Sequence, residues 1–269
     1  MAYITVFRRL VLLVLATQAQ ARALAVPQVE ASARSVAADD NHWVTTWTSM
    51  PQEVEQSNLP PSPFVCLLFS IACFRSRELT LDCSQNGGSM FKDATLRQTL
   101  HMSVGASRIR VQFSNTFGGS DLPITAASIA LPSGSKIGVN GIDTTTLAGL
   151  TFKGGASSVT VPRGQVIYSD PIDFTIEPMS MLTVNMYMQA GQSGNKITGH
   201  PGSRTSSWMQ TGNHLNASTV TGASTKHWYF VSDVEAWAPQ NTSALVILGD
   251  SITDGRGSDD DKNNRFVSV

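Results

Sequence analysis

Short runs in which every second residue is apolar fill the sequence between Thr95 and Trp237, and they constrain the fold more than any other feature. The pattern is clearest in Arg108–Phe113 and in Met181–Met188. A period of two gives a strand with one buried face and one solvated face. Turn-forming residues such as Asp170-Pro171 separate the runs. With no sustained helical period, the region predicts a mainly β fold, an antiparallel β-sandwich or jelly-roll-like domain over residues 42–240.

Five further segments carry the aromatic and β-branched residues that favour strands. They are Trp43–Thr48, Ser158–Val161, Gln165–Tyr168, Ile172–Phe174 and Trp228–Trp237. In the last of these, the expected apolar side consists of Trp228, Phe230, Val234 and Ala236. The prolines at Pro60, Pro61 and Pro63 predict a loop rather than a helix or central strand.

A different pattern follows near the C-terminus, where Ala244–Leu248 is apolar without a polar break and is followed by Gly249-Asp250-Ser251. Such a run is typical of a strand buried on both faces of a parallel sheet. A serine at the end of that strand would lie where open α/β sheets place their chemistry. If a helix began there, the Ser251 N–H could help to hold an oxyanion. The simpler alternative is a buried strand that ends in a turn.

The segment Gly249–Gly255 resembles the first signature block of the SGNH/GDSL hydrolases, which are serine esterases and acylhydrolases. The chain is most similar to secreted members that carry a β-rich domain ahead of the catalytic one. The similarity covers Trp43 to about Pro63 and Asn86 to Arg265. Four other stretches that carry it are Trp43–Thr48, Thr95–Thr99, Gln112–Gly118 and His200–Arg204.

The resemblance implies that Ser251 is the nucleophile and that its N–H forms part of the oxyanion hole. The residues that support the motif are Gly249, Asp250, Thr253, Asp254 and Gly255. It implies ester hydrolysis without a cofactor, on a substrate such as an acylated carbohydrate or lipid. Residues 241–269 would then be the first strand and turn of a truncated α/β/α SGNH hydrolase domain.

The family's later blocks supply a Gly and an Asn for the oxyanion hole and an Asp-x-x-His pair that activates the serine, and no position up to Val269 matches them. A serine without a base is a poor nucleophile. We therefore expect the chain as given to be inactive.

The N-terminus has the pattern of a secretory signal, with Arg8 and Arg9 before the apolar run Leu10–Ala16. We expect residues 1–25 to be a signal peptide and residues 26–41 a leader. The run is too short for a membrane span, which needs about 20 residues. Sequons at Asn216 and Asn241 fit a glycosylated, secreted, extracellular protein.

The composition argues against two classes of partner. A formal net charge of −1, with 14% charged residues, provides no basic field for nucleic acid or for an anionic membrane surface. We therefore expect no nucleic acid and no stable membrane anchor. The alternative to an esterase is a non-catalytic carbohydrate-binding module, in which an exposed tryptophan such as Trp208 would stack on sugars.

The segment Val65–Gln85 is unlike its surroundings and interrupts the family resemblance. Valine codons begin with GT and a glutamine codon can end in AG, and the length suits a short intron. We interpret it as a translated intron, with a genuine apolar hairpin or helix as the alternative; residues 266–269 suggest a second such event. All three cysteines, Cys66, Cys73 and Cys83, lie in this segment, and an odd count in a secreted chain predicts a free or intermolecular thiol.

For the other polar residues that could take part in chemistry, structural roles are favoured over functional ones. His200 lies in a glycine-bounded loop, where a loop-fixing hydrogen bond is favoured over a catalytic role. Asp254 is expected to favour the first turn of a following helix through the helix dipole. Asp259-Asp260-Asp261 lacks the later ligands of a calcium loop and is read as a solvated loop. No metal site is expected.

Overall fold

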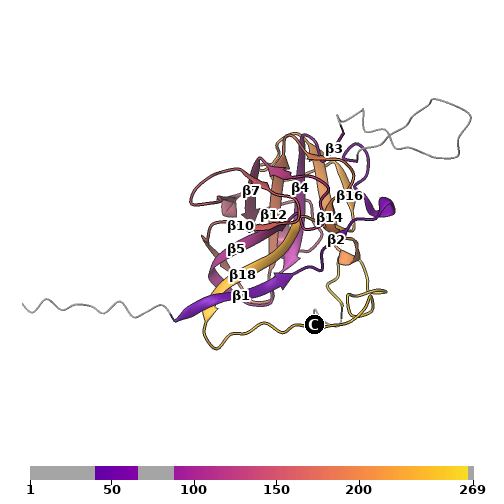
Figure 1. Cartoon of the computed structure of the whole chain (residues 1–269). Helices are drawn as coiled ribbons and strands as arrows, with labels where there is room; N and C mark the ends of the chain where they lie inside the picture. Colours follow the sequence, from indigo (N-terminus) through magenta and orange to yellow (C-terminus); the bar gives the residue numbers. More distant parts are fainter. Residues whose placement is uncertain (1–39, 66–87, 266–269) are drawn as a thin grey trace, which may run out of the picture. The chain divides into compact units, whose positions relative to one another are not determined.

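Antiparallel strands dominate the computed structural model, which describes residues 40–65 and 88–265 (Figure 1). Within these ranges, helical structure is limited to short 3-10 turns. They are η1 (Gln56–Asn58), η3 (Ser133–Ser135), η4 (Thr144–Thr146) and η5 (Pro201–Ser203). The prediction of a mainly β, antiparallel chain is confirmed.

One of the two large sheets has five strands in the order β1-β18-β5-β10, with β11 also paired with β5. The strands are β1 (Asn41–Thr48), β5 (Ala106–Ser114), β10 (Val166–Tyr168), β11 (Ile172–Ile176) and β18 (Val231–Pro239). All their pairings are antiparallel. The alternation in β5 is confirmed, since Ile109, Val111 and Phe113 are fully buried.

The second large sheet has six strands in the order β16-β15-β4-β12-β7-β8. They are β4 (Ala94–His101), β7 (Ala126–Ala130), β8 (Ala148–Leu150), β12 (Met181–Met188), β15 (Ser207–Thr211) and β16 (Ala223–Thr225). The prediction that β12 has a solvated face is wrong. Thr183 and Asn185 are as fully buried as Leu182 and Val184. The strand lies between β4 and β7, and further chain segments cover its polar side.

Arg97 of β4 shows what covers that polar side. Its guanidinium donates to Asn185 Oδ1 at 2.7 Å, to Asn140 O at 2.8 Å and to Ala217 O at 2.8 Å. The side chain is completely buried, and this burial lowers the pKa of Arg97 to about 10. A buried cation is tolerated when its donors are satisfied, so Arg97 ties the loops around Asn140 and Ala217 to the sheet.

Three small sheets also form within the described ranges, in the orders β13-β3, β17-β14-β2 and β6-β9. Their strands are β2 (Gln52–Glu53), β3 (Ser89–Met90), β6 (Leu122–Ile124), β9 (Val159–Val161), β13 (Gln192–Ser193), β14 (Thr198–His200) and β17 (Trp228–Tyr229). The predicted strand Trp228–Trp237 is thus split at Phe230, which has a φ of 63°. Its expected apolar residues are nevertheless buried.

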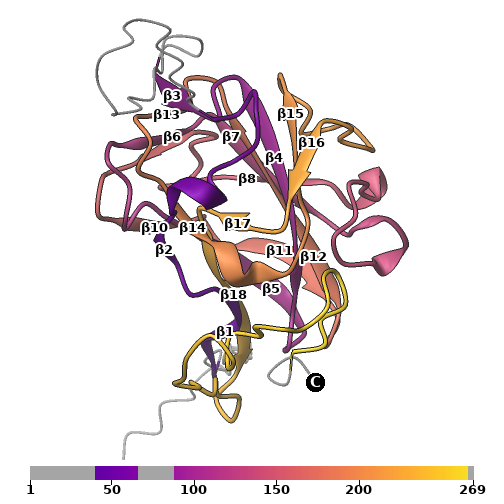
Figure 2. The same ribbon diagram turned by 90° about the vertical axis from the view of Figure 1, so that its right-hand side faces the viewer.

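Among the described residues, one hydrophobic cluster draws side chains from both large sheets, whose strands Figure 2 shows from a second side. The five-stranded sheet contributes residues such as Val111 and Val234, and the six-stranded sheet contributes Leu96, Leu182 and Met186. Burial of such side chains contributes about 1.5–3 kcal/mol each. This shared core holds the elements that position the candidate site.

The predicted strand Ala244–Leu248 is not formed. Leu245 is 85% exposed and Leu248 91% exposed, and no strand among the described residues pairs with the segment. A strand requires partners for its backbone N–H and C=O groups. Without parallel neighbours, the apolar composition alone does not produce a strand.

The predicted signal peptide, the leader up to residue 39 and nearly all of the Val65–Gln85 insert lie outside the described residues. The residues around the insert are close together, because the Phe91 N–H donates to Phe64 O at 2.9 Å. The described segments before and after the insert are therefore adjacent at Phe64 and Phe91.

Candidate functional site

The Gly249–Gly257 segment, here called the serine turn, folds into consecutive tight turns. The Ile252 N–H donates to Asp250 Oδ1 at 2.9 Å, and the Asp254 N–H donates to Asp250 O at 3.0 Å. An Asp that accepts a hydrogen bond from the N–H two residues later is a common turn former. Asp250 therefore shapes the turn around Ser251.

Glycines decide how this turn begins and ends. A side chain on Gly249 would overlap Thr253 Oγ1, and Gly255 has a φ of 104°. Left-handed backbone of this kind strongly favours glycine and interrupts a helix. The helix expected after Ser251 is therefore absent, and single turns take its place.

Ser251 itself is exposed. Neither its hydroxyl nor its N–H hydrogen-bonds to an acceptor among the described residues. Its carbonyl accepts from the Arg256 N–H at 2.7 Å. Both groups that acyl transfer would use are thus open to a ligand, but no described histidine hydrogen-bonds to the hydroxyl.

Asp254 does not have the predicted helix-dipole role; it contacts a histidine instead. Its Oδ1 lies 3.0 Å from His200 Nε2. The other ring nitrogen of His200, Nδ1, lies 2.6 Å from Met50 O, and the ring stacks on Trp228 with centroids 5.9 Å apart. The loop-fixing interpretation of His200 is confirmed, and the sequence missed its partner.

The acidic run Asp259–Asp261 is only partly the solvated loop that was expected. Asp261 accepts from the Ser206 N–H at 2.7 Å, from Ser206 Oγ at 2.8 Å and from Lys226 Nζ at 2.5 Å. Burial alone would raise the pKa of Asp261, but the hydrogen bonds from Lys226 and Ser206 outweigh it and lower the pKa. Among the residues that the structure covers, no cluster of side chains could hold a metal ion.

Arg265 supplies a third contact between the C-terminal segment and the β-sheets. Its guanidinium lies 5.3 Å from the centroid of the Trp228 ring, within the range of a cation–π contact. Burial lowers the pKa of Arg265. Asp254, Asp261 and Arg265 together attach the segment, yellow in Figure 1, beside the orange turn η5.

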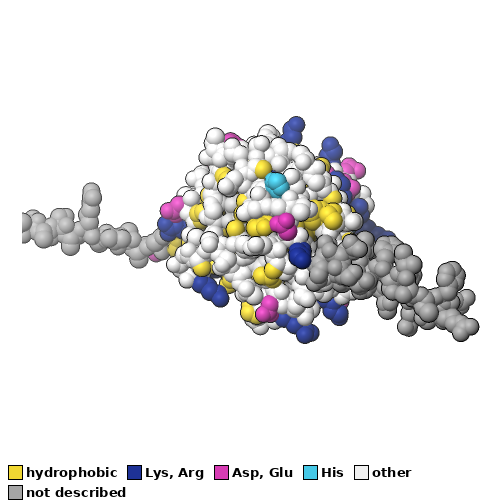
Figure 3. Space-filling model, turned by 90° about the horizontal axis from the view of Figure 1, so that it is seen from above, with side chains coloured by type: hydrophobic (Ala, Val, Ile, Leu, Met, Phe, Trp, Pro, Cys, Tyr) yellow, Lys and Arg dark blue, Asp and Glu magenta, His cyan; other side chains and the backbone are white. Residues whose placement is uncertain are grey.

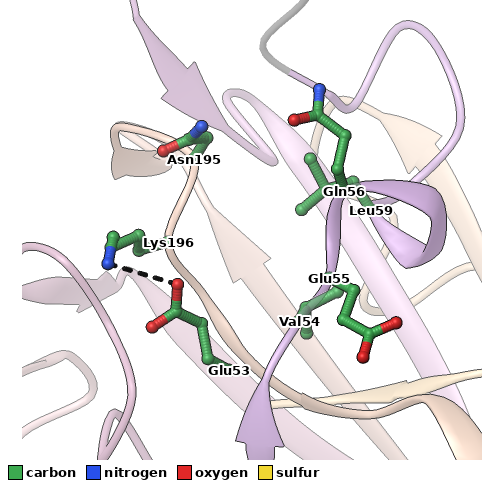
Figure 4. A pocket seen from close by; sticks show the side chains of 7 residues that line it. All are labelled: Glu53, Val54, Glu55, Gln56, Leu59, Asn195 and Lys196. Atoms are coloured by element: carbon green, nitrogen blue, oxygen red, sulfur yellow. Dashed lines mark ion pairs between the residues drawn. The ribbon is translucent and has the colours of Figure 1, made fainter.

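A pocket of about 300 Å³ lies beside η1 (Figure 4). Its wall includes an ion pair in which Lys196 Nζ is 3.3 Å from Glu53 Oε1. The lining residues are Glu53, Val54, Glu55, Gln56, Leu59, Asn195 and Lys196. The pocket was not predicted, because it joins two loops that are far apart in the sequence and neither carries a recognisable motif.

The remaining predicted residues have simple surroundings. Asn216 and Asn241 are exposed, as a glycosylation site requires. Trp208 is only half-buried, but its Nε1 donates to Gly138 O at 2.9 Å, so its polar edge is held against the protein. On the face shown in Figure 3, charged side chains of both signs are scattered and no basic patch forms.

A buried carboxylate lies on the five-stranded sheet. Asp233 is 8% exposed, and burial, followed by the nearby charge of Glu235, raises its pKa to about 6. Its Oδ2 accepts weak hydrogen bonds of 3.3 Å from Thr45 and Tyr168. Asp233 therefore titrates near neutral pH, away from the serine turn.

Comparison with known proteins adds no relative: no family model matches the chain, and no curated protein matches it. Within the described part of the chain, no helix has the length and apolar character needed to cross a membrane.

Proposed function

We propose that this chain carries the nucleophile of a secreted SGNH/GDSL-type serine esterase or acylhydrolase. The observation that carries the proposal is the serine turn, in which a family-like motif presents Ser251 with an exposed hydroxyl and an unengaged N–H. Its substrate would be an ester, such as an acylated carbohydrate or lipid.

In the proposed reaction, Ser251 Oγ attacks the ester carbonyl carbon and its proton passes to a base. The Ser251 N–H helps to hold the oxyanion. The alcohol leaves with a proton from the base, and water then hydrolyses the acyl-serine. No cofactor takes part. His200 is not assigned as the base, since both of its nitrogens face other acceptors; the base is the distal histidine of the family.

We also propose that the sheets form a β-sandwich or jelly-roll-like domain and that residues 241–269 begin an α/β/α catalytic domain. The shared core of the two large sheets supports a β-sandwich or jelly-roll-like domain. The exposed run Ala244–Leu248 fits the first strand of an α/β/α catalytic domain, because partner strands would bury its side chains. The carbohydrate-module alternative is weaker, since Trp208 is not freely exposed.

The test is to join the chain to the distal Asn and Asp-x-x-His blocks of a family member and to assay hydrolysis of p-nitrophenyl esters. Hydrolysis should appear, and Ser251→Ala should reduce kcat by at least about 10³-fold. Ser258→Ala is the matched control, because Ser258 Oγ instead donates to Gly255 O at 2.6 Å. Turnover that survives Ser251→Ala would refute the assignment.

A further inference from the structure

His200 connects three separate parts of the chain. It ends β14 with a side chain that is 5% exposed. One ring nitrogen contacts the Met50 carbonyl at 2.6 Å, and the other contacts the Asp254 carboxylate at 3.0 Å. The histidine therefore links the chain after β1 to the serine turn.

The chemistry of these contacts depends on protonation. A carbonyl oxygen and a carboxylate are both acceptors, so each contact needs an N–H from the ring. A neutral imidazole has one N–H, and only the imidazolium has two. The two hydrogen bonds can therefore exist together only when His200 is charged.

Close packing makes the position of Asp254 specific. A Cβ on Gly202 of η5 would overlap Asp254 Oδ2 and would lie 3.3 Å from His200 Nε2. The carboxylate thus fills the space that the missing side chain leaves. A larger residue at position 202 would displace the Asp254 carboxylate most, while the chemical identity of both partners stays the same.

Other charged groups surround the pair. His227, close to His200, has its pKa lowered by burial. Arg265 has its pKa lowered by burial, with Asp254 opposing that shift. The other charged or titratable groups on the packed elements include Glu53, Arg204, Lys226, Tyr229, Asp260 and Asp261, and the serine turn itself adds Asp250 and Arg256. Of all these carboxylates, Asp254 alone is in direct contact with the His200 ring.

We propose that His200 is a positioning residue that, as the imidazolium, holds Asp254 and thereby fixes the serine turn against the β17-β14-β2 sheet. The consequence for catalysis rests on the proposed function, since it matters only if Ser251 is the nucleophile. The His200–Asp254 contact, here called the latch, does not itself depend on turnover. The serine turn is held when both ring nitrogens of His200 donate, and it is released when one of them no longer carries a hydrogen.

Hydrogen exchange of the full chain between pH 5 and pH 8 tests the latch. Protection factors, corrected for intrinsic rates, are compared for residues 252–258 in the wild type, His200→Gln, Asp254→Asn and Gly202→Ala. In the wild type, protection should be about tenfold lower at pH 8 than at pH 5. Each variant should show the low protection factors at both pH 5 and pH 8. His214→Gln is the control, because the His214 ring hydrogen-bonds within its own turn, through Nε2 to Thr211 O at 2.9 Å.

Protection in the wild type that does not change with pH would overturn the proposal, and so would wild-type protection in Asp254→Asn. The amides of β12 report in the same experiment that the sheets remain folded, and Gly202→Ala leaves both partners of the latch chemically intact. A chain with the pH-dependent protection but no esterase activity after addition of the distal blocks would refute the proposed function alone.

Discussion

Two stretches of this chain for which the sequence predicts strands lie in opposite environments. Met181–Met188 forms β12, which pairs with β4 on one side and β7 on the other. Ala244–Leu248 pairs with nothing described, and Val246 is 83% exposed where Val184 of β12 is fully buried. The difference shows that an apolar β-type sequence becomes a strand only where neighbouring strands accept its backbone hydrogen bonds.

The largest expected effect separates these two stretches directly. Leu182→Ala removes a fully buried side chain and should lower the free energy of unfolding by about 2–5 kcal/mol. Leu248→Ala, at a position 91% exposed, should change it by less than about 0.5 kcal/mol. Urea unfolding measures both, and equal losses would mean that Leu248 is buried in solution.

A carboxylate within the sheet should behave differently from one in the C-terminal segment. The pKa of Asp233 is about 6 when folded, above the usual pKa of an aspartate, about 3.9. Its contribution to stability is therefore present below about pH 4 and is lost as pH rises through 6. Asp233→Asn should gain about 2 kcal/mol over the wild type at pH 8 and nothing at pH 4. Denaturant unfolding at the two pH values checks this, and a constant difference would contradict the assigned pKa.

For Asp261, the contribution to the free energy of unfolding is expected to change with pH in the opposite direction. Its pKa is lowered, so its stabilising contacts are present above the unfolded pKa and are lost as pH falls through the lowered value. Asp261→Asn should cost about 1 kcal/mol at pH 7 and progressively less toward pH 3. The exposed Asp259, paired only locally with Asn264, is the matched control. Chemical denaturation at both pH values supplies the comparison; equal costs at pH 3 and pH 7 would contradict it.

The smallest effect is expected for the insert. The described residues on its two sides are joined by the Phe91–Phe64 hydrogen bond, and a shorter connection changes loop entropy only slightly. Deleting residues 66–85, with Val65 kept, should leave the free energy of unfolding within about 1 kcal/mol. A chain that no longer folds would show that the insert is part of the structure.

The sequence identified the elements whose signal is local. Alternation in Arg108–Phe113 and Met181–Met188 gave two central strands, and the buried apolar side of β5 followed from it. Strand pairing was not predicted, because β4 and β12 are brought together by contacts between distant residues such as Arg97 and Asn185. Ala244–Leu248 forms no strand among the described residues for the same reason: its composition is local, and the partners of a strand are not.

In the candidate site, too, the sequence predicted the local features but not the contacts between distant residues. The motif located Ser251, and Asp250 shapes the turn through neighbouring atoms. The contacts of Asp254 with His200 and of Asp261 with Ser206 join residues about fifty positions apart. Nothing in either stretch of sequence signals its partner, so only the folded chain reveals how the serine turn is attached.

The most direct test of the central claim, that Ser251 is the nucleophile, is covalent labelling with a fluorophosphonate. The chain joined to the distal blocks would be treated and digested, and the modified residue would be located by mass spectrometry. We expect one label, on Ser251, which is lost in Ser251→Ala and retained in Ser258→Ala. Ester hydrolysis accompanied by a label on another residue, or by none, would contradict the assignment.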